Sequence, residues 1–153
     1  MSDDLKMTVD KFTFLVHGDR YYSEVGVWAF WMQPQGNNRV RVGLTDYLQQ
    51  HGGDAAFVIA KPAGTKLAVG DDFAEVETVK TLLVLPSPVN GMIVEINRAL
   101  EVNPELVNQD PYDKGWIAEI ETTQWAADCA KLLDPPAYFS AMKSQVEKEL
   151  KES

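Results

Sequence analysis

The chain has 153 residues, of which 45% are hydrophobic, and this is enough for one domain with a sizeable buried core. Its formal charge of −9 disfavours nucleic acid and anionic membrane surfaces as partners, because both carry negative charge. Cys129 is the only cysteine, which excludes an internal disulfide and is typical of the cytoplasm, where we expect the protein. No apolar run approaches the roughly 20 residues of a membrane-spanning helix, and the acidic start Met1-Ser2-Asp3-Asp4 is unlike a secretory signal.

The first segments are predicted to be a flexible N-terminus and an aromatic strand region. Residues 1–11 are polar, and we expect them to be flexible, so that a single folded domain spans 12–153. Residues 12–32 are rich in aromatic side chains, and partial alternation within them is typical of a strand. We interpret the rings as core residues, because large rings dominate burial in small domains. The alternative is a wall of a groove that holds a cofactor arm.

The middle of the chain is predicted to form short strands separated by turns. A turn at 33–38 precedes a half-buried strand at 39–44, and Thr45 caps a short helix over 46–50 that Gly52-Gly53 ends. Further strands are expected at 55–60, 73–79, 92–96 and 116–120. This pattern is typical of a small β-sandwich or flattened barrel.

The C-terminal pattern predicts helices over about 123–150, which makes the fold class α+β, mainly β. Thr123 can cap a first helix, and Asp134-Pro135-Pro136 can start a second one, because proline is tolerated in a first turn. Cys129 lies on the apolar stripe of the first helix, so we interpret it as a packing residue; the alternative is a reactive thiol. The second helix has one apolar face, formed by Phe139, Met142, Val146 and Leu150.

One lysine has an unusual setting. Lys80 lies in a run of aliphatic residues and is the only charged residue between Glu77 and Glu95. A cation in such a run must be paired or be lifted into solvent at a bend, and a bend keeps both flanks in one core. We therefore interpret Lys80 as the tip of a hairpin, although its neighbours are not typical residues of a tight turn. The alternative is an exposed lysine on an edge strand.

Other candidate sites are weaker. His17 and His51 lack neighbours at metal-ligand spacing, and we expect both on the surface. The sequence has no glycine-rich phosphate loop, no nucleophile elbow and no clear acid–base pair. We therefore do not expect the protein to be an enzyme in its own right.

Three stretches resemble the glycine-cleavage H-protein family. Glu77-Thr78-Val79-Lys80, followed by Ser87-Pro88-Val89-Asn90-Gly91, resembles its lipoyl-attachment signature, and Asn103-Pro104-Glu105-Leu106-Val107-Asn108 resembles part of its long loop. The likeness covers residues 39 to 139. It implies a lipoyl/biotinyl-type flattened barrel, a sandwich of two small sheets, with lipoate in amide linkage to Lys80. Glu77 would then help a lipoate-protein ligase to recognise the hairpin; the alternative is a solvated carboxylate.

Biotin is the competing cofactor for a lysine on a hairpin tip. Biotin carriers resemble Met-Lys-Met at the attachment point, whereas Val79 and Thr81 flank the lysine here. Lipoate is therefore favoured. The resemblance also implies that the cofactor supplies the redox and group-carrying chemistry, because a lysine side chain does neither.

Two departures from the family pattern change the expected partners. The family usually has a His-Glu-Trp element where residues 27–32 of this chain have no histidine, and small residues then an acid where this chain has Thr81-Leu82-Leu83-Val84. These departures resemble the lipoate-binding proteins of the heterodisulfide-reductase-like sulfur oxidation system. We therefore expect a sulfur carrier that acts with that complex and with dihydrolipoamide dehydrogenase. The alternatives are an H protein that carries the aminomethyl group between glycine cleavage enzymes, and an interaction module without lipoate.

Overall fold

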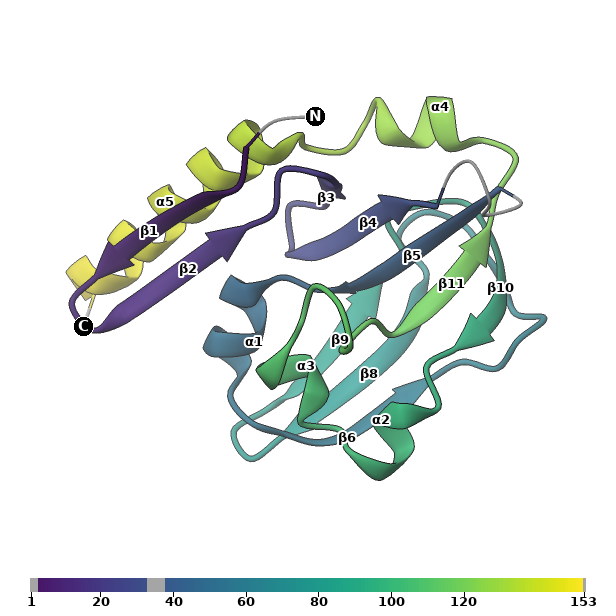
Figure 1. Ribbon diagram of the computed structural model, residues 1–153, viewed down its shortest axis with the longest axis horizontal. Coiled ribbons are helices and arrows are strands. Elements are labelled where there is room, and N and C mark those ends of the chain that lie inside the picture. Colours follow the sequence, from purple (N-terminus) through teal and green to yellow (C-terminus); the bar gives the residue numbers. More distant parts are fainter. Residues whose placement is uncertain (1–2, 33–37, 153) are drawn as a thin grey trace.

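The computed structural model describes residues 3–32 and 38–152, and these residues form three antiparallel sheets (Figure 1). The largest sheet contains, in the order of pairing, β3 (Tyr21–Tyr22), β4 (Val27–Trp31), β5 (Arg39–Leu44), β11 (Ala118–Glu121), β10 (Gly91–Ile96) and β7 (Lys66–Leu67). A three-stranded sheet contains, also in the order of pairing, β6 (Ala55–Ala60), β8 (Asp72–Thr78) and β9 (Leu82–Pro86). A separate hairpin pairs β1 (Leu5–Val9) with β2 (Phe12–Val16).

Five helices accompany the sheets in the described residues. They are α1 (Asp46–Gly52), α2 (Ala99–Val102), α3 (Leu106–Gln109), α4 (Trp125–Cys129) and α5 (Pro135–Glu152). The longest, α5, begins where predicted: Pro135 opens it, and the Ala137 N–H donates to the Asp134 carboxylate at 2.9 Å. None of the helices in the described ranges is long and apolar enough to span a membrane.

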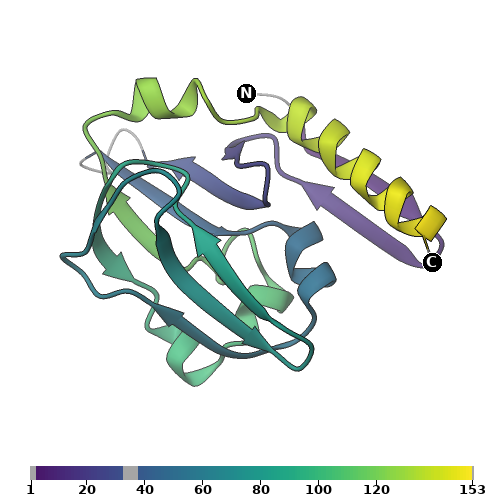
Figure 2. The ribbon, with the colours of Figure 1, turned by 180° about the vertical axis from the view of Figure 1, so that it is seen from behind.

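Two hydrophobic clusters form the interior. The first lies between the largest sheet, which contributes Val42 and Ile120, and the three-stranded sheet, which contributes Val76 and Leu85. This arrangement confirms the predicted fold class, a mainly-β α+β sandwich with C-terminal helical structure. Both ribbon views place the β1–β2 hairpin and α5 side by side, away from the three-stranded sheet (Figures 1 and 2). We call these three elements the cap.

The second cluster lies under the cap. It joins Phe14 of the hairpin to Met142 and Val146 of α5, and it includes Trp28 of β4. Tyr22 and Trp28 are fully buried, which confirms the core interpretation for these two rings of the aromatic region. When the apolar face of a helix packs against a hairpin, each element gains a buried face that it does not have alone.

The N-terminus differs from expectation. Residues 5–9 were expected to be flexible with the rest of 1–11, but they form β1, which pairs in register with β2 from Leu5 opposite Val16 to Val9 opposite Phe12. Half-buried and exposed residues alternate along β1, which matches the alternation of apolar and polar residues in its sequence. Asp10 enters the turn with φ 55, a conformation that aspartate tolerates.

The remaining element predictions differ mostly at their ends. The strand predicted at 55–60 coincides with β6, whereas the helix expected over 46–50 continues to Gly52. The helix expected from Thr123 is short, because α4 ends at Cys129. The turn predicted at 33–38 falls, except for Asn38, outside the described residues.

Candidate functional site

Lys80 lies in the turn that joins β8 to β9, which confirms the hairpin interpretation. The Thr78 N–H donates to the Thr81 carbonyl oxygen at 2.8 Å and closes the turn. The Thr78 hydroxyl oxygen accepts the backbone N–H groups of Lys80 at 3.1 Å and Thr81 at 3.0 Å, and it lies 3.1 Å from the Thr81 carbonyl oxygen, to which it donates. A buried threonine hydroxyl therefore satisfies the polar groups of a turn that contains no glycine.

The Lys80 side chain is exposed, and within the described residues it forms no ion pair or side-chain hydrogen bond. Its stem passes over the end of α1. A Cβ built on Gly53 would lie 3.0 Å from the Lys80 Cε and 3.8 Å from its Cδ. Gly53 also has φ 89, a conformation that glycine adopts freely. The amine is therefore held on a short turn and is open to solvent.

The neighbouring glycine provides room for β9. A Cβ built on Gly52 would lie 2.7 Å from the Leu83 Cδ1, closer than real Cβ contacts. The Gly52-Gly53 pair was predicted only to end the helix, and it does: the Gly53 N–H donates to the Gln49 carbonyl oxygen at 3.1 Å. Its second role, close approach of the β8–β9 hairpin to α1, follows from the tertiary structure.

Asn108 of α3 holds the backbone beneath the lysine stem. Its amide nitrogen donates to the Gly53 carbonyl oxygen at 3.0 Å and to the Gln49 side-chain oxygen at 3.1 Å. Its amide oxygen accepts the Ala55 N–H at 2.9 Å. Sequence reasoning used Asn108 only as part of a family motif and missed this role, because its partners lie more than 50 residues away along the chain.

Glu77 and Glu75 lie on the outer side of β8, and both are exposed. Within the described residues neither carboxylate forms an ion pair or a hydrogen bond, so Glu77 is not a partner of Lys80. Glu77 is opposite Leu82, which makes this pair the last one before the turn. The carboxylate is therefore available to an approaching protein.

The other candidate residues lie elsewhere. His17 is half-buried and stacks on Tyr112 with ring centroids 4.3 Å apart, which corrects the expectation of a surface residue. His51 is exposed, as expected. Cys129 is half-buried, and partial burial, together with the Asp128 carboxylate, raises the pKa of its thiol, so the thiolate form is disfavoured. No group of three metal-ligating side chains occurs in the described part of the chain.

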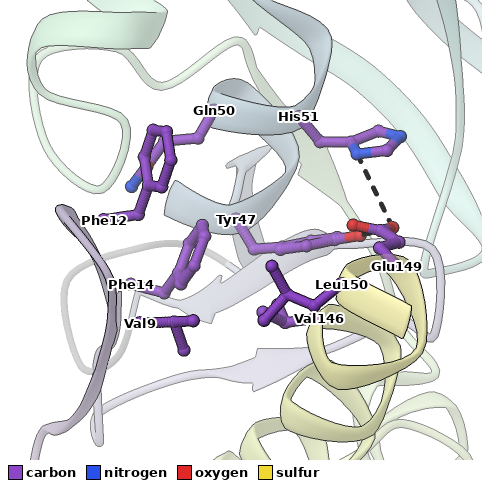
Figure 3. A pocket seen from close by; sticks show the side chains of 9 residues that line it. All are labelled: Val9, Phe12, Phe14, Tyr47, Gln50, His51, Val146, Glu149 and Leu150. Atoms are coloured by element: carbon purple, nitrogen blue, oxygen red, sulfur yellow. Dashed lines mark hydrogen bonds and ion pairs between the residues drawn. The ribbon is translucent and has the colours of Figure 1, made fainter. Parts of the chain in front are cut away.

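A pocket of about 240 Å³ lies between the cap and α1 (Figure 3). Phe12 and Phe14 form its hairpin side, and Tyr47 and His51 form its α1 side. The Tyr47 hydroxyl donates to Glu149 at 2.5 Å, and the His51 Nδ1 lies 3.7 Å from the same carboxylate oxygen. Tyr47 and His51 of α1 therefore meet Glu149 of α5 at this pocket, and the contacts connect α1 to the cap.

Comparison with known proteins gives consistent results. A family model described as "Glycine cleavage H-protein" matches residues 20–145. The "Glycine cleavage system H protein" of Thermus thermophilus is 42% identical over 127 residues, which cover 83% of this chain and 95% of that protein. That of Mycolicibacterium vanbaalenii is 43% identical over 110 residues, which cover 71% and 84%. The crystal structure of a glycine cleavage system H protein from Mycobacterium marinum has a TM-score of 0.71 at 31% identity, covering 80% of this chain and 95% of that one.

Proposed function

The chain belongs to the glycine cleavage H-protein family, whose members are non-catalytic carriers of lipoate bound covalently to a lysine, and on this premise we propose that Lys80 carries the lipoyl arm here. The observation that carries the proposal is an exposed lysine amine, free of ion pairs within the described residues, at the tip of a short β-hairpin. A modifying enzyme can reach such an amine without unfolding the carrier.

The surroundings of Lys80 fit an amide-linked arm. Gly53 leaves space beneath the stem, and no carboxylate in the described residues competes for the amine. The Thr78 hydroxyl holds the backbone of the turn, and Asn108 holds the loop over which the stem passes. When bound, lipoate supplies a disulfide that opens on reduction or thiolate attack and can carry a group on one sulfur.

Glu77 is the residue we assign to recognition by a lipoate-protein ligase. It lies three residues before Lys80, on the outer side of β8, with an unpaired carboxylate. A ligase has to distinguish this lysine from other surface lysines, and a fixed charge at a fixed offset from the turn gives it a means of doing so. The cytoplasmic location expected from the lone Cys129 stays a prediction.

We assign the carrier to glycine cleavage, where its partners would be glycine decarboxylase, aminomethyltransferase and dihydrolipoamide dehydrogenase. The relatives described above are all named for that system. A sulfur carrier of the heterodisulfide-reductase-like system is the second candidate. The observation that favours it is the apolar strand after the lysine, where Leu82 and Val84 are 51% and 43% exposed. The comparisons provide no support for that subtype.

Intact-mass measurement tests the attachment site. Protein produced with a lipoate-protein ligase and lipoate should gain one lipoyl group, and Lys80→Arg should gain none, while Lys61→Arg and Lys66→Arg should be modified like wild type. Modification of the Lys80→Arg variant would place the arm elsewhere. Reconstitution with purified glycine decarboxylase, aminomethyltransferase and dihydrolipoamide dehydrogenase then tests the system. A fully loaded carrier that does not support glycine cleavage would overturn that assignment and favour the sulfur candidate.

A further inference from the structure

The outer side of the three-stranded sheet has an unusual composition. Side chains alternate between its two sides, so that residues of one row across the strands share a side. In one row Glu77 of β8 lies between Phe57 and Leu82. In the next row Glu75 lies between Ile59 and Val84. Each row therefore has a carboxylate in the centre and an apolar side chain on either side. We call these six residues the outer face.

The apolar members of the outer face are more exposed than a single domain requires. Phe57 and Ile59 are 59% and 62% exposed, and Leu82 is 51% exposed. The inward-facing residues of the same strands, such as Val76 and Leu85, are almost completely buried, so the sheet does not lack a core. Contiguous exposed apolar side chains on a folded domain mark a surface that another molecule covers.

The outer face is continuous with the lysine turn. Its first row, at Glu77 and Leu82, is the last pair of the β8–β9 ladder before the turn. Val79, inside the turn, is an 80% exposed apolar residue between this row and Lys80 along the chain. A molecule that covers the outer face would therefore lie beside the lysine. This places the surface within reach of any enzyme that acts on that side chain.

The two carboxylates determine what kind of molecule can cover this surface. Covering an unpaired carboxylate removes its water, which is costly unless the covering surface supplies a cation or hydrogen-bond donors. Glu75 and Glu77 have no cationic partner within the described residues. A second copy of the chain stacked on this face would bring four carboxylates together, and an acidic partner would be repelled in the same way.

We propose that the outer face is the docking surface for an enzyme that acts on the arm of Lys80, an inference that rests on the role proposed above for this lysine. The enzyme presents two basic side chains, about 7 Å apart to match residues i and i+2 of a strand, within an apolar rim. The charge pairs set orientation and the rate of encounter, and the apolar rows exclude water around them. The proposal extends recognition from Glu77 alone to a two-row surface.

The test uses purified glycine decarboxylase as the probe and the loaded carrier as the varied substrate; because Glu77 is also assigned to ligase recognition, each carrier is first loaded to completion, as judged by intact mass. Glu75→Lys/Glu77→Lys reverses both charges, and Glu147→Lys/Glu152→Lys, on the exposed side of α5, makes the same change in net charge away from the sheet. The KM for the outer-face variant should rise on the order of tenfold at low salt, with kcat unchanged, whereas the α5 variant should stay close to wild type. Added salt should raise the KM of the wild-type carrier and reduce the difference in KM between wild type and the outer-face variant.

A binding measurement separates docking from loading. The arm-less Lys80→Arg protein should inhibit the wild-type carrier competitively, and Ile59→Thr/Val84→Thr in that background should weaken the inhibition, whereas Val102→Thr, on exposed α2, should not. Equal KM values for the two charge-reversed variants would overturn the proposal, and so would a wild-type dimer that dissociates on Ile59→Thr/Val84→Thr.

A failure of the proposed function gives a different result. If wild-type protein is loaded at Lys80 but is no substrate for glycine decarboxylase, the assignment to glycine cleavage fails, and the same variants are compared as substrates of the lipoate-protein ligase. If the two charge-reversed variants then had equal KM values for ligation, the outer face would be excluded as a docking surface. If no lysine is loaded, the intact mass shows it, and the docking proposal falls together with the role of Lys80.

Discussion

The cap and the outer face use apolar side chains in opposite ways. In the cap, Phe14, Met142 and Val146 are each less than a tenth exposed, because the hairpin and α5 cover one another and one side of the largest sheet. On the outer face, Phe57 and Ile59 are more than half exposed, and nothing in the described chain covers them. The cap therefore covers one side of the largest sheet, whereas the outer face of the three-stranded sheet, which adjoins Lys80, is left open to solvent.

The comparison with the family sharpens this difference. The family match covers residues 20–145, so the whole β1–β2 hairpin and the last residues of α5 lie outside it. The lysine hairpin and the outer face lie inside it. The cap thus adds burial to a domain whose proposed carrier site is built from the matched segment, and the two regions should respond differently to substitution.

The largest expected effect is on stability, at the junction of the cap and the largest sheet. Trp28 is completely buried, and its indole N–H donates to the Pro111 carbonyl oxygen at 3.0 Å. Trp28→Ala should lower the free energy of unfolding in urea by about 3–5 kcal/mol. Phe57→Ala, the matched change on the outer face, should alter it by less than about 0.5 kcal/mol. A comparable loss for Phe57→Ala would mean that the outer face is packed, and the contrast between the regions would disappear.

A smaller effect on stability is expected from substitutions in the lysine turn. We expect them to change the rate of lipoylation more than the stability of the fold. Thr78→Val removes the hydroxyl that accepts two backbone N–H groups. This change should lower the free energy of unfolding by about 1–2 kcal/mol. Because the turn then loses its fixed geometry, the initial rate of lipoylation should fall although Lys80 is intact. Thr78→Ser should restore both properties. Thr81→Val, at an exposed position of the same turn, should leave both close to wild type; an equal loss there would point to general disorder of the turn.

This turn also shows how far sequence reasoning reaches. The charge of Lys80 in an apolar run and the Gly52-Gly53 helix stop are local features, and both led to correct structural predictions. The device that makes the turn possible is also local, because a threonine hydroxyl that bonds residues two and three positions ahead is a known alternative to glycine. The sequence did not indicate it, because glycine and asparagine are the usual signs of a tight turn, and residues 78–81 contain neither.

The remainder of the site depends on contacts between distant segments. Asn108 meets Gly53 only because α3 packs against α1, and no spacing in the sequence encodes that contact. The outer face was missed for a different reason. Phe57 and Ile59 alternate with residues that are equally apolar, so the sequence does not tell which side of β6 is the buried one. Only the pairing with Glu75 and Glu77 identifies the open side.

The smallest expected effect concerns the attachment of the cap to α1 and depends on pH. Partial burial raises the pKa of Glu149, but hydrogen bonds from Tyr47 and Gln145, together with the electrostatic effect of His51, outweigh it and lower the pKa below its ordinary value. The folded pKa is therefore below the unfolded one, so the carboxylate stabilises the fold above the unfolded value of 4.5, and this contribution is lost as the pH falls through the folded pKa.

Tyr47→Phe removes one of those donors and should reduce stability by less than about 1 kcal/mol near neutral pH, because the carboxylate is partly exposed. The difference between wild type and this variant should shrink as urea unfolding is repeated from about pH 6 down to about pH 3. Tyr21→Phe provides the control, because the Tyr21 hydroxyl has no hydrogen bond within the described residues. A difference that persists at about pH 3 would show that the Tyr47 hydroxyl stabilises the fold independently of the charge on Glu149, and equal stability at every pH would show that Tyr47 joins the cap to α1 by the packing of its ring alone.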